Sequence, residues 1–315
     1  MKEIILHELN KKAFISGEKL AKSLNVSRTA VWKHIKALKQ IGYEIETVKN
    51  KGYRLISSPD VPIESELKQN LKTKIIGSNI QYKKSVYSTN LTAKDIASTK
   101  IREGTVVVAG KQTKGRGRKQ RQWYSPEGGL WFSIILYPNL PPEDGILVTM
   151  AASVSVAEAI QKSTGLIPMI KWPNDILIDG KKVCGILTEF DAEMDRVNYV
   201  VVGIGINVNN ELSKDISKIA ASLKQLMGSK VSRVNLLKLI LTKFDEMYNE
   251  ILTGNFRYVR DSWSTFANIV GKKIRVAGER GDIEGYVKDV DEHGCIILET
   301  PERKIRVLSG DVTYL

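Results

Sequence analysis

Gly115-Arg116-Gly117-Arg118-Lys119-Gln120-Arg121-Gln122-Trp123 is the segment that says most about the fold and function of this chain. Glycines let backbone N–H groups approach a ligand closely, arginine side chains bind phosphate or carboxylate oxygens in pairs, and an indole offers a flat face to a base. The segment therefore predicts an anion-binding loop whose ligand is a nucleotide or an acyl phosphate. Taken alone, it fits a solvated basic loop or a nucleic-acid patch equally well.

Two common phosphate-binding motifs are excluded by the residues around this loop. A Walker A motif needs GxxxxGK[ST], and Gly110 and Gly115 have its glycine spacing, but Arg116 and Gly117 follow. The lysine and the hydroxyl that would reach phosphate and magnesium are therefore missing. The dinucleotide motif GxGxxG fails because Gln120 stands at the position of the third glycine.

The composition is that of a multidomain protein with a hydrophobic core. The chain has 315 residues, of which 42% are apolar, and this length predicts two or three domains. It contains no apolar run of about eighteen residues and starts without a signal-peptide pattern, so a cytoplasmic protein with no membrane partner is expected. The net charge of +13 indicates a polyanionic partner.

The cysteines and histidines give no reason to expect a structural metal. Cys184 and Cys295 are far apart in the sequence and are expected to be reduced thiols in the core. His7, His34 and His293 have no zinc-ligand spacing and form no obvious pair with a nucleophile.

The first sixty residues have the pattern of a helix-turn-helix. Residues 16–24 fit a short helix, residues 25–26 a tight turn, and Ser27 can cap a second helix that runs to about Lys39. Val31, Ile35 and Leu38 are spaced to form one buried face of that helix, which leaves its opposite face exposed.

A basic hairpin follows the second helix. Residues 43–48 alternate like a strand, residues 49–52 turn, and residues 53–55 return, so that residues 1–60 are predicted to form a winged helix. The alternative is a generic helical packing module with a solvated basic face. The side chains expected to contact DNA are Ser27, Arg28, Thr29, Trp32, Lys33, Lys36, Lys49 and Lys51.

Three further segments add polar groups to apolar surroundings. Ser88-Thr89-Asn90 precedes a predicted helix at residues 91–97. Its hydroxyl and amide groups either cap the start of this helix or bind a polar ligand there. Residues 170–178 insert a Pro-Asn-Asp turn between apolar strand residues, and residues 179–182 turn into the next strand. Residues 199–209 are a buried strand whose glycines allow close approach, or a central strand with a bulge.

The last part of the chain is predicted to form a small barrel. Short alternating strands are expected at residues 269–276, 283–287, 295–299 and 304–307, separated by Gly and Asp turns. This pattern favours an SH3-like β-barrel.

In this order, these segments resemble the biotin-protein ligase family, specifically its bifunctional members that double as biotin operon repressors. The resemblance spans essentially the whole chain. Its specific parts are Ser88-Thr89-Asn90, the GRGR loop ending at Trp123, Lys171-Trp172-Pro173-Asn174-Asp175, Lys182 before Cys184-Gly185-Ile186-Leu187, and Gly203-Ile204-Gly205-Ile206-Asn207. One departure is Gln120, because members often carry glycine there.

The resemblance implies an α+β multidomain fold. It comprises a winged helix-turn-helix domain at residues 1–60, a central mixed α/β domain of the biotin/lipoate-protein ligase type at residues 66–268, and an SH3-like barrel at residues 269–315. Biotin and ATP are the implied substrates, with Mg²⁺. Biotin is activated as biotinyl-5'-AMP and then transferred to a lysine of an acceptor protein.

The implied site residues fall into three groups. Arg116, Arg118 and Lys182 are expected to be catalytic because they neutralise carboxylate and phosphate charge, and Asp175 is a candidate for magnesium. The biotin-binding residues are expected to be Ser88, Thr89, Asn90, Gln112, Gly115, Arg116, Gly117, Arg118, Lys182 and Gly185. The ATP-binding residues are expected to be Arg118, Arg121, Trp123, Asn174, Lys182 and Asn207.

The resemblance also implies partners. They are the biotin carboxyl carrier domain of acetyl-CoA carboxylase or another biotin-dependent carboxylase, operator DNA, and a second copy of the chain when biotinyl-AMP is bound. One alternative is a biotin-sensing DNA-binding regulator without ligase activity, against which Arg118 and Lys182 argue. A lipoate-type acyl ligase is disfavoured by the KWPND and GRGR motifs and by the winged helix.

Overall fold

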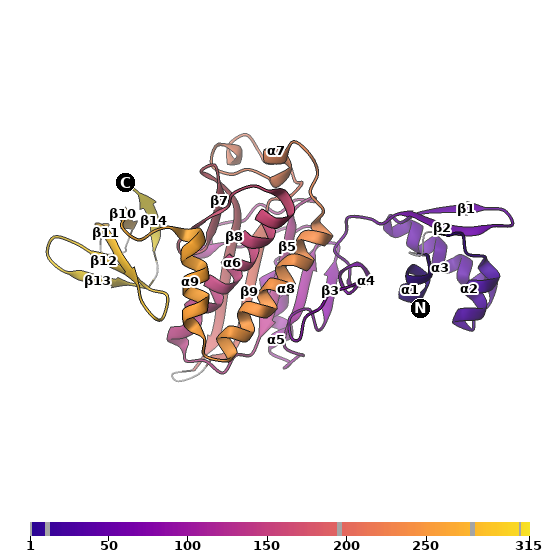
Figure 1. Ribbon diagram of the computed structural model, residues 1–315, viewed down its shortest axis with the longest axis horizontal. Helices are drawn as coiled ribbons and strands as arrows, with labels where there is room; N and C mark the ends of the chain where they lie inside the picture. Colours follow the sequence, from indigo (N-terminus) through magenta and orange to yellow (C-terminus); the bar gives the residue numbers. More distant parts are fainter. Residues whose placement is uncertain (1, 10–12, 194–196, 278–280, 309) are drawn as a thin grey trace. The chain divides into compact units, whose positions relative to one another are not determined.

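The chain folds into two compact units that meet in sequence at Val61 and Pro62 (Figure 1). The computed structural model describes residues 2–9, 13–193, 197–277, 281–308 and 310–315, and each unit is described by itself. Among these residues, no helix is long and apolar enough to cross a membrane.

The N-terminal unit is a helix-turn-helix followed by a two-stranded hairpin. Its elements are α1 (Lys2–Leu9), α2 (Gly17–Leu24), α3 (Arg28–Ile41), β1 (Glu44–Val48) and β2 (Gly52–Ser57). The predicted turn and cap are confirmed, because Asn25 adopts a left-handed conformation and Ser27 Oγ accepts a hydrogen bond from the backbone N–H of Ala30. Helix α1 was not predicted from the sequence.

The two faces of α3 differ as its periodicity predicts. Val31, Ile35 and Leu38 are buried, whereas every predicted DNA-contacting side chain on α3 and in the hairpin turn is exposed. Gly52 is required in the hairpin, because its φ is +104° and a Cβ there would lie 2.0 Å from the carbonyl oxygen of Ile15.

The larger unit is built on a seven-stranded sheet with the order β3-β4-β5-β9-β8-β7-β6. Its strands are β3 (Ile80–Lys83), β4 (Thr105–Ala109), β5 (Leu130–Leu136), β6 (Met169–Lys171), β7 (Asp175–Ile178), β8 (Lys181–Ala192) and β9 (Val197–Ile206). Only the β3–β4 pair is parallel among these strands. The predicted hairpin between β7 and β8 is confirmed, since Asp179 and Gly180 both have positive φ.

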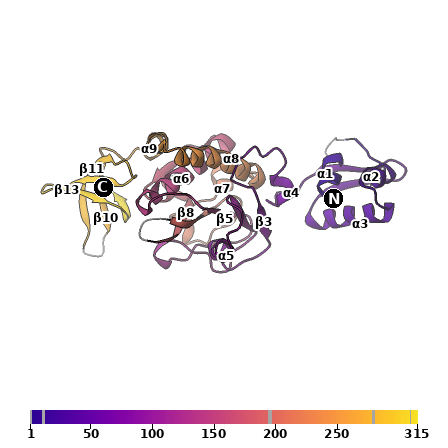
Figure 2. The same cartoon turned by 90° about the horizontal axis from the view of Figure 1, so that it is seen from below.

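Helices cover both faces of this sheet (Figure 2). The helices are α4 (Glu64–Leu67), α5 (Thr89–Ala97), α6 (Gly145–Thr164), α7 (Leu223–Met227), α8 (Arg233–Leu252) and α9 (Phe256–Ala267). Helices α6, α8 and α9 pack on one face, and α5 packs on the other. The central strands β4, β5 and β9 are mostly apolar because they are buried on both sides, and Ser133 of β5 is a buried polar exception.

Alternation along β9 decides which side chains face α5. Val200 and Val202 belong to the large core under α6 and α8, whereas Val201 packs against Ala93 and Ala97 of α5. Because side chains alternate in a strand, Gly203 and Gly205 lie on the same face as Val201. The two glycines therefore leave space on the α5 side of the sheet.

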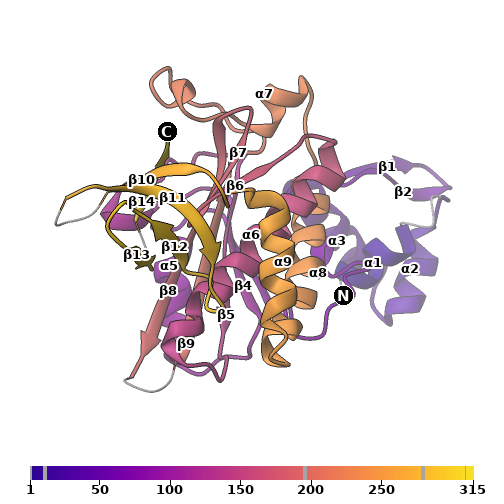
Figure 3. The same cartoon turned by 60° about the vertical axis from the view of Figure 1, so that its left-hand side comes forward.

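The C-terminal segment forms a five-stranded antiparallel sheet with the order β13-β12-β11-β10-β14 (Figure 3). Its strands are β10 (Lys273–Ala277), β11 (Ile283–Val290), β12 (Ile296–Glu299), β13 (Lys304–Val307) and β14 (Asp311–Tyr314). The first four correspond to predicted strands, and β14 was missed. This sheet packs on the start of α6, where Gly294 lies beside Ile146 and Met150.

An ion pair joins this sheet to α6 and makes the packing sensitive to pH. His293 Nδ1 lies 2.7 Å from Asp144 Oδ1, and this hydrogen bond raises the pKa of His293. Because the pKa of His293 is higher in the folded protein than in the unfolded chain, its protonation stabilises the fold. This stabilisation is fully present below about pH 6.5 and is lost as the pH rises through the pKa of the folded protein. We expect His293→Gln to lower the free energy of unfolding more at about pH 6 than at about pH 9 in urea titrations. Equal losses at both pH values would contradict this account.

Candidate active site

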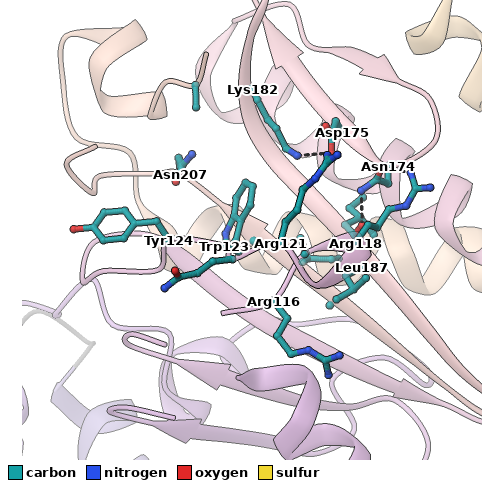
Figure 4. A pocket seen from close by; sticks show the side chains of 18 of the residues that line it. Arg116, Arg118, Arg121, Trp123, Tyr124, Asn174, Asp175, Lys182, Leu187 and Asn207 are labelled. Carbon is teal, nitrogen blue, oxygen red and sulfur yellow. Dashed lines mark hydrogen bonds and ion pairs between the residues drawn. The ribbon is translucent and has the colours of Figure 1, made fainter. Parts of the chain in front are cut away.

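A cavity of about 790 Å³ lies on the α5 side of the seven-stranded sheet. Its walls come from β7, β8 and β9, from the start of α5, from the loops at residues 112–124 and 212–220, and from Asp311. The volume is in the range of small-molecule sites, which are about 300–1,000 Å³. Figure 4 shows Trp123 of the loop near Lys182 of β8, whose side chain reaches toward Asp175 of β7.

The predicted biotin-binding and ATP-binding residues lie around this one cavity, apart from Gly115. The backbone of Gly115 is packed beneath the loop, where a Cβ would lie 2.4 Å from the carbonyl oxygen of Trp123. The carbonyl of Gly115 accepts a hydrogen bond from the backbone N–H of Trp123 at 2.9 Å. Gly115 therefore lets the two ends of the loop approach each other.

The loop between these ends turns sharply. The backbone N–H of Gly117 donates to the carbonyl of Arg121 at 2.8 Å, and a short 3₁₀ turn spans Arg118–Gln120. Lys119 and Gln120 have φ values of +51° and +59°. A left-handed conformation costs a residue with a side chain free energy that glycine does not pay, so this turn holds Lys119 and Gln120 in a conformation that glycine adopts more readily.

One end of the cavity is lined by the start of α5. Ser88 occupies the N-cap position, but its side chain makes no capping hydrogen bond. Gln112 takes over that role, because its Oε1 accepts from the backbone N–H of Thr89 at 2.7 Å and from Thr89 Oγ1 at 3.1 Å. Ser88 therefore lines the cavity with its hydroxyl unused for capping, at the end where Thr89, Asn90 and Gln112 also lie.

Asn90 forms the floor at this end. Its Nδ2 donates to the carbonyl of Leu187 at 3.1 Å and to Glu189 Oε2 at 2.8 Å, and its Oδ1 accepts from Ser133 Oγ at 2.6 Å. Asn90 as a whole is 4% exposed, and a Cβ on Gly203 would come within 1.9 Å of its Oδ1. Both amide donors of Asn90 are thus used within the protein.

Trp123 lies on a pair of glycines in the sheet. Gly185 of β8 and Gly205 of β9 are cross-strand partners, and Cβ atoms there would lie 3.2 Å and 2.3 Å from the indole. The ammonium of Lys182 stands 5.1 Å from the indole ring centroid, a cation–π arrangement. The side chain of Asn90 therefore packs against Gly203, and the side chain of Trp123 packs against Gly205.

This packing predicts that Gly205→Ala weakens substrate binding. The new methyl group would displace the indole, so we expect the KM values for the ligands of this cavity to rise about tenfold, which corresponds to about 1.4 kcal/mol. Steady-state kinetics check this. In a Trp123→Ala background the same methyl group meets no indole, so Gly205→Ala should add little there. Additive effects of the two changes would contradict a contact between them.

The opposite end of the cavity is rich in charge. Lys182 Nζ lies 2.7 Å from Asp175 Oδ1, and Arg118 Nη1 donates to Asn174 Oδ1 at 3.0 Å. Burial lowers the pKa of Arg118, while Asp311 and Asp175 act in the opposite direction. Asn207 also lines this end, and its Oδ1 accepts from Asn210 Nδ2.

The C-terminal sheet contributes to this end. Asp311 Oδ2 lies 2.7 Å from Arg121 Nη2 and 3.4 Å from Lys119 Nζ, and Arg118 donates to the carbonyl of Gly310 at 3.3 Å. The carboxylate of Asp311 thus forms ion pairs with cationic side chains of the loop. Sequence reasoning did not find Asp311, because its partners in the loop lie about two hundred residues earlier in the chain and no local pattern marks such a contact.

Arg116 is the one loop arginine that points elsewhere. Figure 4 shows its side chain directed away from Arg118, Arg121 and Lys182. Its Nη1 lies 3.6 Å from Glu189 Oε1, at the α5 end of the cavity. Other residues that sequence reasoning missed are Ser133 and Glu189 beneath the cavity and Gln122, Tyr124, Leu187, Leu212, Ile216, Ile219 and Ala220 in its lining.

The fold and the cavity fit a class of protein: an enzyme that binds small anionic ligands and also carries a helix-turn-helix domain. Residues 82–207 match the biotin/lipoate A/B protein ligase family, residues 2–54 a helix-turn-helix domain, and residues 269–313 the biotin protein ligase C-terminal domain. The chain is 43% identical over 303 residues to the bifunctional ligase/repressor BirA of Bacillus subtilis, covering 95% of this chain and 93% of that protein. This chain belongs to the family of bifunctional biotin ligase/repressors.

More distant relatives agree with this assignment. The bifunctional ligase/repressor BirA of Escherichia coli is 26% identical over 288 residues, covering 91% of this chain and 88% of that protein. A solved structure of the biotin protein ligase from Aquifex aeolicus in complex with biotin and ATP superposes with a TM-score of 0.65 at 30% identity. That match covers 76% of this chain and 99% of the Aquifex chain.

Proposed function

We propose that this chain activates biotin as biotinyl-5'-AMP with ATP, transfers it to a lysine of a biotin carboxyl carrier domain, and represses biotin synthesis or transport genes. Ligation and repression follow from membership in the family. The observation that carries the chemistry is the cavity, whose polar α5 end suits the ureido group and whose cationic end suits a phosphate. Acceptor lysines of acetyl-CoA carboxylase or other biotin-dependent carboxylases are the proposed targets.

The first step joins two anions and needs no general base. A carboxylate oxygen of biotin attacks the α-phosphorus of ATP, the bond to the β-phosphate oxygen breaks, and pyrophosphate leaves. Charge neutralisation and alignment are therefore the main requirements. Lys182 and Arg118, both directed into the cavity, would neutralise the reacting groups, and Asp175 holds the Lys182 ammonium at the cavity wall.

The second step transfers the acyl group. The neutral amine of the acceptor lysine attacks the acyl carbon of the mixed anhydride, AMP leaves with the electron pair of the broken C–O bond, and the new amide loses a proton. Lys182 would stabilise the charge that develops on the departing AMP. A loop closed over the anhydride would exclude water until the acceptor binds. Proteolysis within residues 110–122 should then slow sharply when biotin and ATP are added.

Magnesium fits the cationic end as a companion of ATP. Among the described residues no group of three or more His, Cys, Asp or Glu side chains could hold a metal. Asp175 is one carboxylate and is already paired with Lys182. Asp175 is therefore the carboxylate that would help to hold Mg²⁺ brought in with ATP, and the ion would supply positive charge to offset that of the leaving pyrophosphate.

The direct experiment is incorporation of labelled biotin into a purified carrier domain in the presence of ATP and Mg²⁺. ATP-dependent labelling establishes the ligase. Tight biotin binding without any labelling would instead support the alternative, a biotin sensor that regulates transcription without ligating.

We propose that the adenylate-bound chain forms a homodimer that occupies a two-half-site operator in the cytoplasm. The α3 face and the hairpin turn supply the exposed cations and Trp32 for this contact. Operator affinity should be higher with biotin plus ATP than without them, because only a ligand with different affinities for two states shifts their balance. Equal affinity under both conditions would rule out the coupling.

The N-terminal unit gives a prediction of its own. Lys33→Ala and Lys36→Ala should each weaken operator binding and lower the slope of log K against log salt by about 0.9. Lys22→Ala, which removes an exposed lysine from α2, is the matched control and should leave the slope unchanged. Fluorescence anisotropy at several salt concentrations measures this, and an unchanged slope for Lys33→Ala and Lys36→Ala would remove both lysines from the interface.

A further inference from the structure

Glu189 lies beneath the α5 end of the cavity and contacts three groups from two different elements. Its carboxylate lies 2.8 Å from Asn90 Nδ2, 3.0 Å from Lys94 Nζ and 3.6 Å from Arg116 Nη1. Asn90 and Lys94 belong to α5, whereas Arg116 belongs to the glycine-rich loop. The Glu189 side chain is 17% exposed, so these interactions are shielded from most of the solvent.

The position of Glu189 in the sheet fixes this arrangement. Glu189 pairs with Val201 across β8 and β9, and Val201 faces α5. Cross-strand partners point to the same side of a sheet, so the carboxylate is directed toward α5. A carboxylate in a well-packed strand is a more rigid anchor than one in a loop.

Charge strengthens the anchor. Burial acts to raise the pKa of Glu189, but hydrogen bonds from Asn90 and Lys94 and the charges of Lys94 and Arg116 outweigh it, so the pKa is lowered. The side chain is therefore an anion at neutral pH. Hydrogen bonds to a charged group are stronger than those between neutral groups.

A chain of hydrogen bonds leads from Glu189 back to the other end of the loop. It runs from Asn90 to Ser133, Thr89, Gln112 and Ser125, and Ser125 Oγ donates to the carbonyl of Trp123 at 2.9 Å. Arg116 and Trp123 flank the turn of the loop. The same polar network thus holds the loop at both ends and builds the floor of the cavity.

We propose that Glu189 is a positioning residue that couples closure of the glycine-rich loop to occupancy of the biotin end of the cavity. Through Arg116 it holds the loop, and through Asn90 it holds the start of α5. A ligand that contacts Thr89 and Gln112 therefore favours the closed loop, and a closed loop favours the ligand. This inference rests on the proposed ligase function and assigns to Arg116 a role as a loop anchor.

The test compares Glu189→Gln with Arg116→Met and with the pair combined. Glutamine keeps the shape of Glu189 and can still accept from Asn90, but it has no charge to hold Arg116. We expect the KM for biotin and the rate of escape of biotinyl-AMP to rise about tenfold, with kcat for pyrophosphate release within about threefold. Arg116→Met should reproduce the faster escape, and the double variant should be no worse than either single one.

Lys94→Met is the matched control, because it removes the other cation of Glu189 and leaves the contact with Arg116. It should speed escape far less than Glu189→Gln does, because Glu189 keeps the charge that faces Arg116. The proposal is overturned if Glu189→Gln and Arg116→Met have additive effects, if Lys94→Met speeds escape as much as Glu189→Gln, or if Glu189→Gln leaves both biotin KM and escape unchanged. If the unmodified chain formed no biotinyl-AMP, the proposed ligase function would be wrong. That result differs from the outcomes that overturn the role of Glu189.

Discussion

Replacement of Lys182 by alanine is expected to reduce the rate of biotinyl-AMP formation about 10²- to 10³-fold. Loss of one preorganised group that stabilises transition-state charge has an effect of this size. Lys182 stands between the indole of Trp123 and the carboxylate of Asp175, and the cavity offers no other lysine in that position among the described residues. The loss should appear mainly in kcat, because the charge that Lys182 meets is greatest in the transition state.

The measurement is single-turnover formation of biotinyl-AMP, and the control lies next to Lys182 in the sequence. Lys181 is exposed and donates to the carbonyl of Ser217 at 3.2 Å, outside the cationic end. Lys181→Ala should therefore retain nearly full activity. If Lys182→Ala raised only the KM for ATP and left kcat intact, Lys182 would be a binding group and the proposed role in the transition state would be wrong.

The winged helix could be predicted from the sequence because its signals are local. Ser27 and Asn25 mark the helix start and stop, and Val31, Ile35 and Leu38 recur at helical spacing. These preferences act within a few residues, so no knowledge of distant contacts is needed. The β7–β8 hairpin was predictable for the same reason.

The cavity could be predicted only in part. The resemblance assigned site residues to four segments that are far apart in the sequence. It did not indicate which contacts these residues make within the protein. Asn90 was expected to bind ligand, yet its amide is engaged by Leu187, Glu189 and Ser133. Asp311 and Glu189 were missed because each contacts residues that are far away in the sequence. Such contacts produce no periodic pattern in the sequence.

The glycines show the same limit. Sequence alone indicates that Gly203 and Gly205 allow something to come close, a ligand or another backbone. The structure identifies side chains instead, Asn90 and Trp123. Glycine marks where space is needed, and only the fold determines which group fills it.

Arg118→Gly is expected to release biotinyl-AMP into solution before transfer. Arg118 donates to Asn174 and to the carbonyl of Gly310, so it ties the loop to the residues that precede β7 and β14 at the nucleotide end of the cavity. Hydrogen bonds from a charged group stabilise by about 1.5–3 kcal/mol, so escape of the adenylate should become roughly 10- to 100-fold faster. Adenylate synthesis should fall less, because Lys182 remains in place.

Arg121→Gly separates this role from a general effect of loop charge. Arg121 is on the same loop but is largely exposed and pairs with Asp311, so its loss removes one positive charge and leaves the Arg118 contacts intact. Free biotinyl-AMP and labelled carrier domain, measured in the same reaction, give the fraction that escapes. That fraction should rise strongly for Arg118→Gly and little for Arg121→Gly. Equal rises would mean that the net charge of the loop retains the adenylate, because the two changes remove the same charge and differ in the contacts they break.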